Sequence, residues 1–143
     1  MRIRQLSIFM ENRSGRLAKI TTAIGRAGIN IRAMSLADTS DFGILRLVVT
    51  DAEKARQVLR EQGFTVRISE VIAVAIPDTP GALGRLLGVI EQAELNVEYM
   101  YVVVEKKMDE AILIFRFDAP DRAAEVLQEN DIRLVDEEKV LRV

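Results

Sequence analysis

The sequence contains an internal duplication, and this feature restricts the possible folds more than any other. Residues 8–17, IFMENRSGRL, return at positions 74–83 as VAIPDTPGAL, so that Asn12 aligns with Asp78, 66 positions later. The same displacement carries the segment 29–31 (INI) onto 95–97 (LNV). Further along, Leu45 aligns with Leu113 at a displacement of 68. The second copy therefore has two extra residues, which we place in the polar segment 105–109, because hairpin tips tolerate insertions.

Hydrophobic periodicity in the first copy predicts an alternation of strands and helices. Gly28 and Gly63 are expected to end the two helices, and Asp51 is expected to open the second one. No spacer rich in Gly, Pro or Ser separates the copies around Ser69 and Glu70. We therefore expect them to pack rigidly together. The predicted elements are a strand at 3–10, a helix at about 17–27, strands at 29–36 and 43–49, a helix from 51, and a strand at 64–68.

The order βαββαβ in each copy predicts an α+β fold of two tandem ferredoxin-like sandwiches. In this fold both helices lie on one face of an antiparallel sheet. We expect one domain over residues 1–69 and a second over 70–143. The strands 71–76 and 112–117 carry apolar residues on both faces. Since helices cover only one face, the other face is expected to meet the sister domain or a second chain, which predicts a homodimer.

The composition excludes several classes of function. The 143 residues contain no Cys and no His, which removes thiolate and imidazole metal ligands and the commonest general base. The 20 basic and 22 acidic residues are interspersed, so no basic field exists for nucleic acid. No run approaches the roughly 18 apolar residues of a membrane helix, and no signal peptide is visible. We expect a cytoplasmic protein without cofactor, metal, membrane or nucleic-acid partner.

The segment between the first strand and first helix of each copy carries the chemistry that points to a ligand. Gly15 and Gly81 stand just before a helix start, where free backbone N–H groups and the helix dipole favour a carboxylate. The side-chain oxygens of Asn12 or Asp78, and of Asn30 or Asn96, are available for an ammonium group. A free amino acid carries both groups, so this pattern predicts an amino-acid site.

These residues resemble the signature of the ACT domain family. The resemblance rests on Asn12-x-x-Gly15-x-Leu17 with the segment 28–31 (GINI), and on Asp78-x-Pro80-Gly81-x-Leu83 with the segment 95–97 (LNV). The resemblance covers essentially the whole chain twice. It implies a non-catalytic protein that binds a small amino acid where ACT domains meet and regulates amino-acid metabolism, with a metabolic enzyme as a possible partner.

Carried onto this sequence, the resemblance assigns a set of ligand-binding residues to each copy. Ser14 stands where the family usually has the proline that Pro80 preserves, and Glu94 stands where the first copy has Gly28. The two sites are therefore expected to differ in occupancy. The assigned residues are Asn12, Ser14, Gly15, Leu17, Asn30 and Ile31 in the first copy and Asp78, Pro80, Gly81, Leu83, Asn96 and Val97 in the second.

Three alternatives stand beside this interpretation. Asn12 and Asp78 are also residue types that cap helices or bond to turn amides, which would leave nothing for a ligand. The acidic pair Asp109 and Glu110 could serve an enzyme, but it lies at an expected hairpin tip with no cleft around it. A third possibility is a regulatory subunit that docks on an enzyme without binding a ligand itself.

Overall fold

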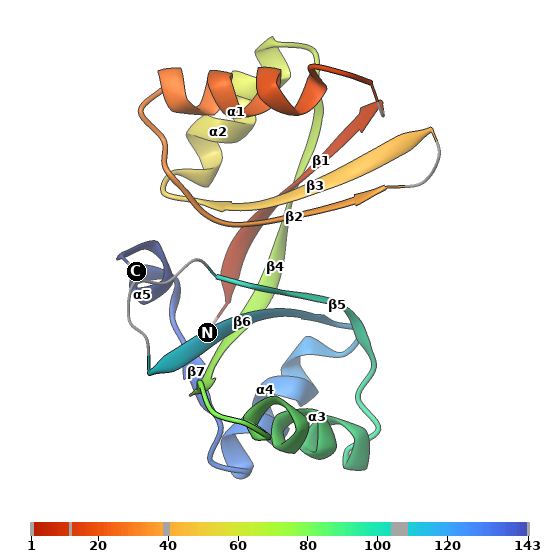
Figure 1. The fold of residues 1–143 in the computed structure, drawn as a ribbon, viewed down its shortest axis with the longest axis vertical. Helices are drawn as coiled ribbons and strands as arrows, with labels where there is room; N and C mark the ends of the chain where they lie inside the picture. Colours follow the sequence, from red (N-terminus) through yellow and green to blue (C-terminus); the bar gives the residue numbers. More distant parts are fainter. Residues whose placement is uncertain (1, 12, 39–40, 104–108, 143) are drawn as a thin grey trace. The chain divides into compact units, whose positions relative to one another are not determined.

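The computed structural model describes residues 2–11, 13–38, 41–103 and 109–142. Their contacts divide the chain into two compact units. We call Arg4–Ser69 the N-terminal unit, and Glu70–Val143 together with the first three residues the C-terminal unit. One strand, β4 (Thr65–Pro77), begins in the N-terminal unit and ends in the C-terminal unit (Figure 1). The predicted rigid packing of the two copies stays a prediction.

The N-terminal unit contains a four-stranded antiparallel sheet with strand order β2-β3-β1-β4. Strand β3 pairs with both β1 and β2, with Leu6 opposite Leu47 and Leu36 opposite Leu45. Helices α1 and α2 lie together on one face of this sheet (Figure 1). The elements of this unit are β1 (Ile3–Glu11), α1 (Arg16–Arg26), β2 (Ile31–Asp38), β3 (Phe42–Val49), α2 (Ala52–Glu61) and the start of β4.

The C-terminal unit repeats this arrangement, with strand order β7-β4-β6-β5. In both units every second residue of the central strands points into the helix-covered core. Ile8 and Leu47 pack on Ile20 and Leu59 in this way, as Val74 and Phe115 do on Leu86 and Leu127. The predicted pair of ferredoxin-like sandwiches is confirmed. The remaining elements are α3 (Ala82–Gln92), β5 (Val97–Val102), β6 (Glu110–Phe117), α4 (Pro120–Glu129), β7 (Arg133–Val135) and α5 (Glu137–Arg142).

Four equivalent turns keep a left-handed backbone even where the two copies differ in residue type. Gly28 has φ 77° and its counterpart Glu94 has φ 57°. Gly63 has φ 88° and its counterpart Asp131 has φ 59°. A residue with a side chain pays a conformational cost at such angles, but the turn after each helix requires them. The helix ends are therefore fixed by the fold and tolerate this change of residue type.

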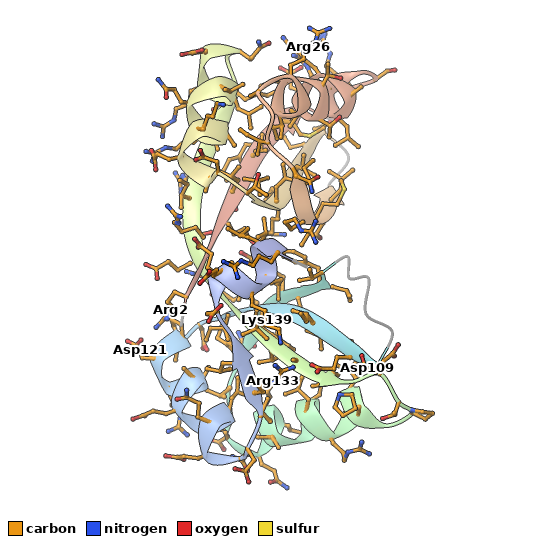
Figure 2. All side chains as sticks on the ribbon, turned by 90° about the vertical axis from the view of Figure 1, so that its left-hand side faces the viewer. Arg2, Arg26, Asp109, Asp121, Arg133 and Lys139 are labelled. Atoms are coloured by element: carbon orange, nitrogen blue, oxygen red, sulfur yellow. The ribbon has the colours of Figure 1, made fainter. Side chains whose placement is uncertain are left out.

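Helix α5 was not predicted from the sequence, because the first copy has no counterpart. It lies on the side of the C-terminal sheet away from α3 and α4 (Figure 1), and its residue Val140 is fully buried. The same unit also holds the chain's first residues through an ion pair between Arg2 and Asp121 on α4 (Figure 2). We predicted a homodimer from the sequence without α5, which covers part of the face of the C-terminal sheet that α3 and α4 leave open. Dimerisation therefore stays a prediction.

None of the helices in the described ranges is long and apolar enough to cross a membrane.

The start of α2 gives a test of local stability. The side chain of Asp51 accepts a hydrogen bond from the N–H of Lys54, at 3.1 Å from N to Oδ1. We expect Asp51→Ala to lower the free energy of unfolding by about 1 kcal/mol in chemical denaturation, because the helix loses its cap. Ser14→Ala is the control, since α1 has no side-chain cap, and should change stability by less than about 0.3 kcal/mol. Equal losses in both variants would contradict this role of Asp51.

Candidate functional site

The segments that lead into α1 and α3 have nearly the same backbone in the two units. Gly15 has φ 86° and ψ −11°, and Gly81 has φ 86° and ψ −10°. Each glycine carbonyl accepts the first helical hydrogen bond at 3.0 Å, from the N–H of Lys19 and of Arg85 respectively. Ser14 in one loop and Pro80 in the other are thus compatible with the same turn. The sequence departure at Ser14 leaves the backbone angles of the following glycine unchanged.

Both of these helices begin without a side-chain cap. At α3 the first amide, of Ala82, donates to the carbonyl of Thr79 at 3.2 Å. The next amides, of Leu83 and Gly84, have no partner in the preceding turn of a helix. The carboxylate of Asp78 is exposed and does not cap α3. Asp78 therefore does not act as the helix cap that the alternative interpretation proposed. Asn12 lies outside the described residues.

A groove of about 420 Å³ lies beside this loop in the C-terminal unit. Its walls come from the loop and the start of α3, with Asp78 and Leu83, and from the neighbouring strand ends, with Val102 and Glu110. The N–H of Asp78 donates to the carbonyl of Asp109 at 3.0 Å, which ties the loop to the start of β6. Leu83 is 40% exposed and Val102 is 56% exposed. The groove combines the carboxylates of Asp78 and Glu110, the start of α3 and apolar side chains.

In each unit the structure separates the two parts of the predicted site, which are the loop before the first helix and the asparagine before the second strand. Strands β1 and β2 both run antiparallel to β3, so they run parallel to each other. The loop at Gly15 follows the end of β1, where Glu11 lies opposite Phe42, whereas Ile31 begins β2 opposite Val49. Helix α1 lies between Gly15 and Asn30, and its 11 residues span about 16 Å.

The same separation holds for the pair Gly81 and Asn96 in the C-terminal unit. Asn96 and Val97 lie at the β6 end where the N–H of Asp118 donates to the carbonyl of Asn96 at 3.3 Å. Asn30 is held similarly, by a hydrogen bond from its N–H to Thr50 Oγ1 at 3.0 Å. Within one unit, therefore, the helix start and the asparagine do not form a single clamp. A ligand bound at the loop meets the ends of the hairpin strands instead.

The hairpin residues Val102 and Glu110 were not among the predicted site residues. The strand order contains the signal that would have identified them, because the end of the second strand and the start of the third lie at the same sheet end as the loop. No cluster of acidic side chains able to hold a metal ion occurs within the described ranges.

Comparisons with known proteins agree with this architecture. A family model described as "ACT domain pair" matches residues 1–143. The crystal structure of protein BT0572 from Bacteroides thetaiotaomicron is 36% identical, covering 100% of this chain and 98% of that chain, with a TM-score of 0.93. No curated protein matches the sequence.

More distant similarity extends to regulatory subunits of aspartate kinase. The ligand-free subunit from Thermus thermophilus is 14% identical with a TM-score of 0.67, covering 88% of this chain and 91% of that one. The subunit from Thermus flavus is 18% identical with a TM-score of 0.63, covering 86% of each chain. At this level of identity the similarity shows the shared fold.

The left-handed glycine before α1 can be tested against a glycine inside the same helix. Gly15→Ala should lower the free energy of unfolding by about 1 kcal/mol, because alanine disfavours a φ of 86° even though no atom lies within 4 Å of the added carbon. Gly25→Ala should raise it by about 0.5 to 1 kcal/mol, because alanine is the better helix former. Chemical denaturation measures both, and a stabilising Gly15→Ala would contradict the assigned loop conformation.

Proposed function

The chain belongs to the ACT domain pair family, and on this basis we propose that it is a non-catalytic regulatory protein of the cytosol that binds a small amino acid at its strand-to-helix loops. The observation that carries this proposal is the pair of uncapped helix starts at Gly15 and Gly81. The second helices of the two units differ from these: α2 uses Asp51 as its own cap, and α4 has no side-chain cap but begins with Pro120, which lacks an N–H.

The C-terminal groove supplies partners for each part of an amino acid. The free amides of Leu83 and Gly84 donate to the α-carboxylate, where the positive end of the helix dipole also favours a negative charge. The exposed carboxylate of Asp78 accepts from the α-ammonium. The apolar side chains of Leu83 and Val102 contact a small or branched aliphatic side chain.

The two units differ in the charge that they offer the ammonium group. The C-terminal loop carries the carboxylate of Asp78, whereas the aligned residue Asn12 has a neutral amide. In the N-terminal unit Glu11, the acid adjacent to Asn12 in the sequence, forms an ion pair with Arg13 at 2.9 Å. A charged acceptor makes the stronger hydrogen bond to an ammonium group, so the C-terminal loop is the tighter of the two sites.

Calorimetric titration of the purified chain with the twenty amino acids tests this function. We expect at least one aliphatic amino acid to bind, and Asp78→Asn to weaken its binding about tenfold through loss of the charged acceptor. Asp118→Asn makes the same charge change at the opposite end of the same unit and should leave the affinity unchanged. Asn12→Ala should affect only the weaker site. An affinity that is the same in the Asp78 and Asp118 variants would contradict the loop assignment.

The second candidate is a regulatory subunit that associates with other chains without binding a ligand. Strand β2 is an edge strand of the N-terminal sheet. On β2, Met34 is 42% exposed and Leu36 is 49% exposed, although both share a face with the buried core residues of β3. Exposed apolar side chains on a free edge strand favour pairing with another chain. This observation also supports the proposed homodimer.

Light scattering of a β2 variant tests association through this edge. We expect Leu36→Lys to convert the dimer into a monomer at micromolar concentration, since a charge placed on an edge strand blocks edge pairing. Thr22→Lys adds the same charge on the outer surface of α1 and should leave the dimer intact. A Leu36 variant with an unchanged mass would place any dimer contact elsewhere.

A further inference from the structure

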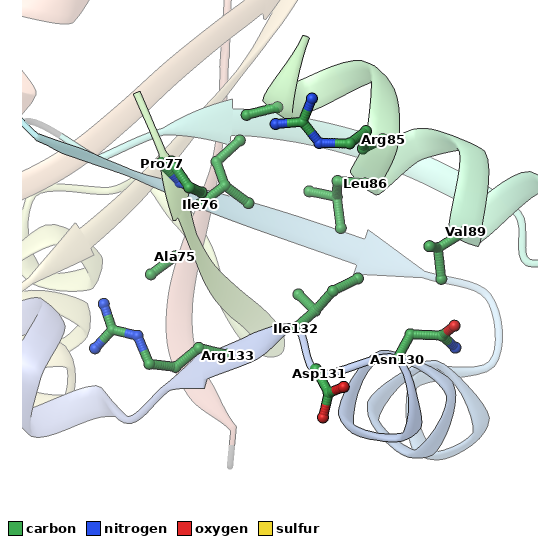
Figure 3. Close-up of a pocket in the computed structure, with 11 residues that line it drawn as sticks. Ala75, Ile76, Pro77, Arg85, Leu86, Val89, Asn130, Asp131, Ile132 and Arg133 are labelled. Carbon is green, nitrogen blue, oxygen red and sulfur yellow. The ribbon is translucent and has the colours of Figure 1, made fainter. Parts of the chain in front are cut away.

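A second hollow lies on the other side of α3 and belongs to neither predicted set of ligand residues. Figure 3 shows its walls, formed by the end of β4, the first turns of α3, and the turn from α4 into β7. Its volume is about 300 Å³. The aliphatic side chains of Ile76, Leu86, Val89 and Ile132 line it, and charged groups stand at its ends. A small apolar pocket with a few polar groups is the usual form of a small-molecule site.

Arg85 provides an uncompensated positive charge at the α3 end of this pocket. Within the described ranges it is the one arginine of the C-terminal unit that has neither an ion pair nor a hydrogen bond for its guanidinium group. The other arginines have partners. These are Arg2 with Asp121, Arg116 with Glu98 and the carbonyl of Glu70, Arg122 with the carbonyl of Ala93, Arg133 with Glu110, and Arg142 with Glu138.

The guanidinium of Arg85 is directed back along its helix toward Gly81. A side-chain carbon placed on Gly81 would lie 3.2 Å from Arg85 Nη1. This position adds a full charge to the partial positive charge of the uncapped helix start. The acidic residue of the pocket, Asp131, lies at the far end, on the turn after α4 (Figure 3). The pocket therefore has the unpaired Arg85 at its α3 end and Asp131 at its α4 end, while Arg133, which also lines it from β7, is paired with Glu110.

The N-terminal unit has an equivalent hollow of similar volume, about 280 Å³, in which the cation is already engaged. The equivalent hollow lies between Met10, Phe64 and Thr65. Phe64 stands where the C-terminal unit has Ile132, and Lys19 stands where it has Arg85. Lys19 Nζ lies 5.6 Å from the ring centroid of Phe64, so the cation is already engaged by an aromatic side chain. In the C-terminal unit Ile132 takes the place of the aromatic ring, and the cation at the aligned position, Arg85, has no such partner among the described residues.

We infer that the pocket between α3 and β7 binds a small aliphatic carboxylate, with Arg85 as its anion anchor and Ile76, Leu86, Val89 and Ile132 around its apolar part. A guanidinium group matches a carboxylate with two parallel N–H donors, which is stronger than a single neutral hydrogen bond. This site adjoins the loop groove, with which it shares Ile76, Pro77 and Ala82 in its lining, but it does not depend on the proposed function. It needs no ammonium group on the ligand.

Titration of the full chain with isovalerate, a branched carboxylate without an ammonium group, tests the inference. We expect a dissociation constant on the order of 1 mM, which is usual for a ligand of this size. Arg85→Gln should weaken binding at least about tenfold, because the charged donor is lost. Lys19→Gln is the matched control at the aligned position of the N-terminal unit and should leave the affinity unchanged.

Two further variants separate this pocket from the loop groove. Ile132→Phe copies Phe64 of the N-terminal unit and should weaken isovalerate binding, because the ring can engage Arg85 as Phe64 engages Lys19, while a thermal melt verifies that the protein is folded. Asp78→Asn should leave isovalerate binding intact, because the ligand offers no ammonium group to that carboxylate. Isovalerate binding that survives both Arg85→Gln and Ile132→Phe would overturn the inference, as would the absence of any binding to the unmodified chain.

Discussion

One left-handed glycine in each unit determines how the first strand passes into the first helix. At a φ of 86° the chain turns sharply, and the helix begins with no side chain in position to bond to its first amides. A helix start of this kind leaves donors that a bound anion can satisfy. The rest of the site depends on this turn, because it brings those amides close to the strand ends that carry Val102 and Glu110.

The fold could be predicted because its signals are local and occur twice. Alternating apolar residues identified the strands, and the cap at Asp51 and the glycine at 63 marked the limits of α2. Because the same order of strands and helices could be assigned in both copies, each copy supported the assignment of the other. Helix α5 was missed because it has no counterpart in the first copy. The extra residues of the second copy fall in the segment 105–109, of which 105–108 lie outside the described residues.

The site was harder to predict, because residues close to a motif in sequence can lie at opposite ends of a sheet. Asn30 follows the loop at Gly15 by only one helix, yet that helix moves it to the far end of the unit. The pocket at Arg85 was missed for another reason. Arg85 is an exposed residue on a helix, and only the structure shows that its guanidinium has no partner within the described ranges and that its side chain lines a hollow. The departures of Ile132 and Asp131 from their counterparts Phe64 and Gly63 were the available sequence signal.

In the proposed complex the uncapped helix starts hold the carboxylate of a bound amino acid. Backbone amide chemical shifts, followed by NMR during titration with an amino acid that binds, test it most directly. We expect the largest shifts at the amides of Leu83 and Gly84, smaller ones at Leu17 and Ala18, and none at the capped start of α2. Binding that leaves the amides of α1 and α3 unchanged, or that shifts α2 equally, would contradict it.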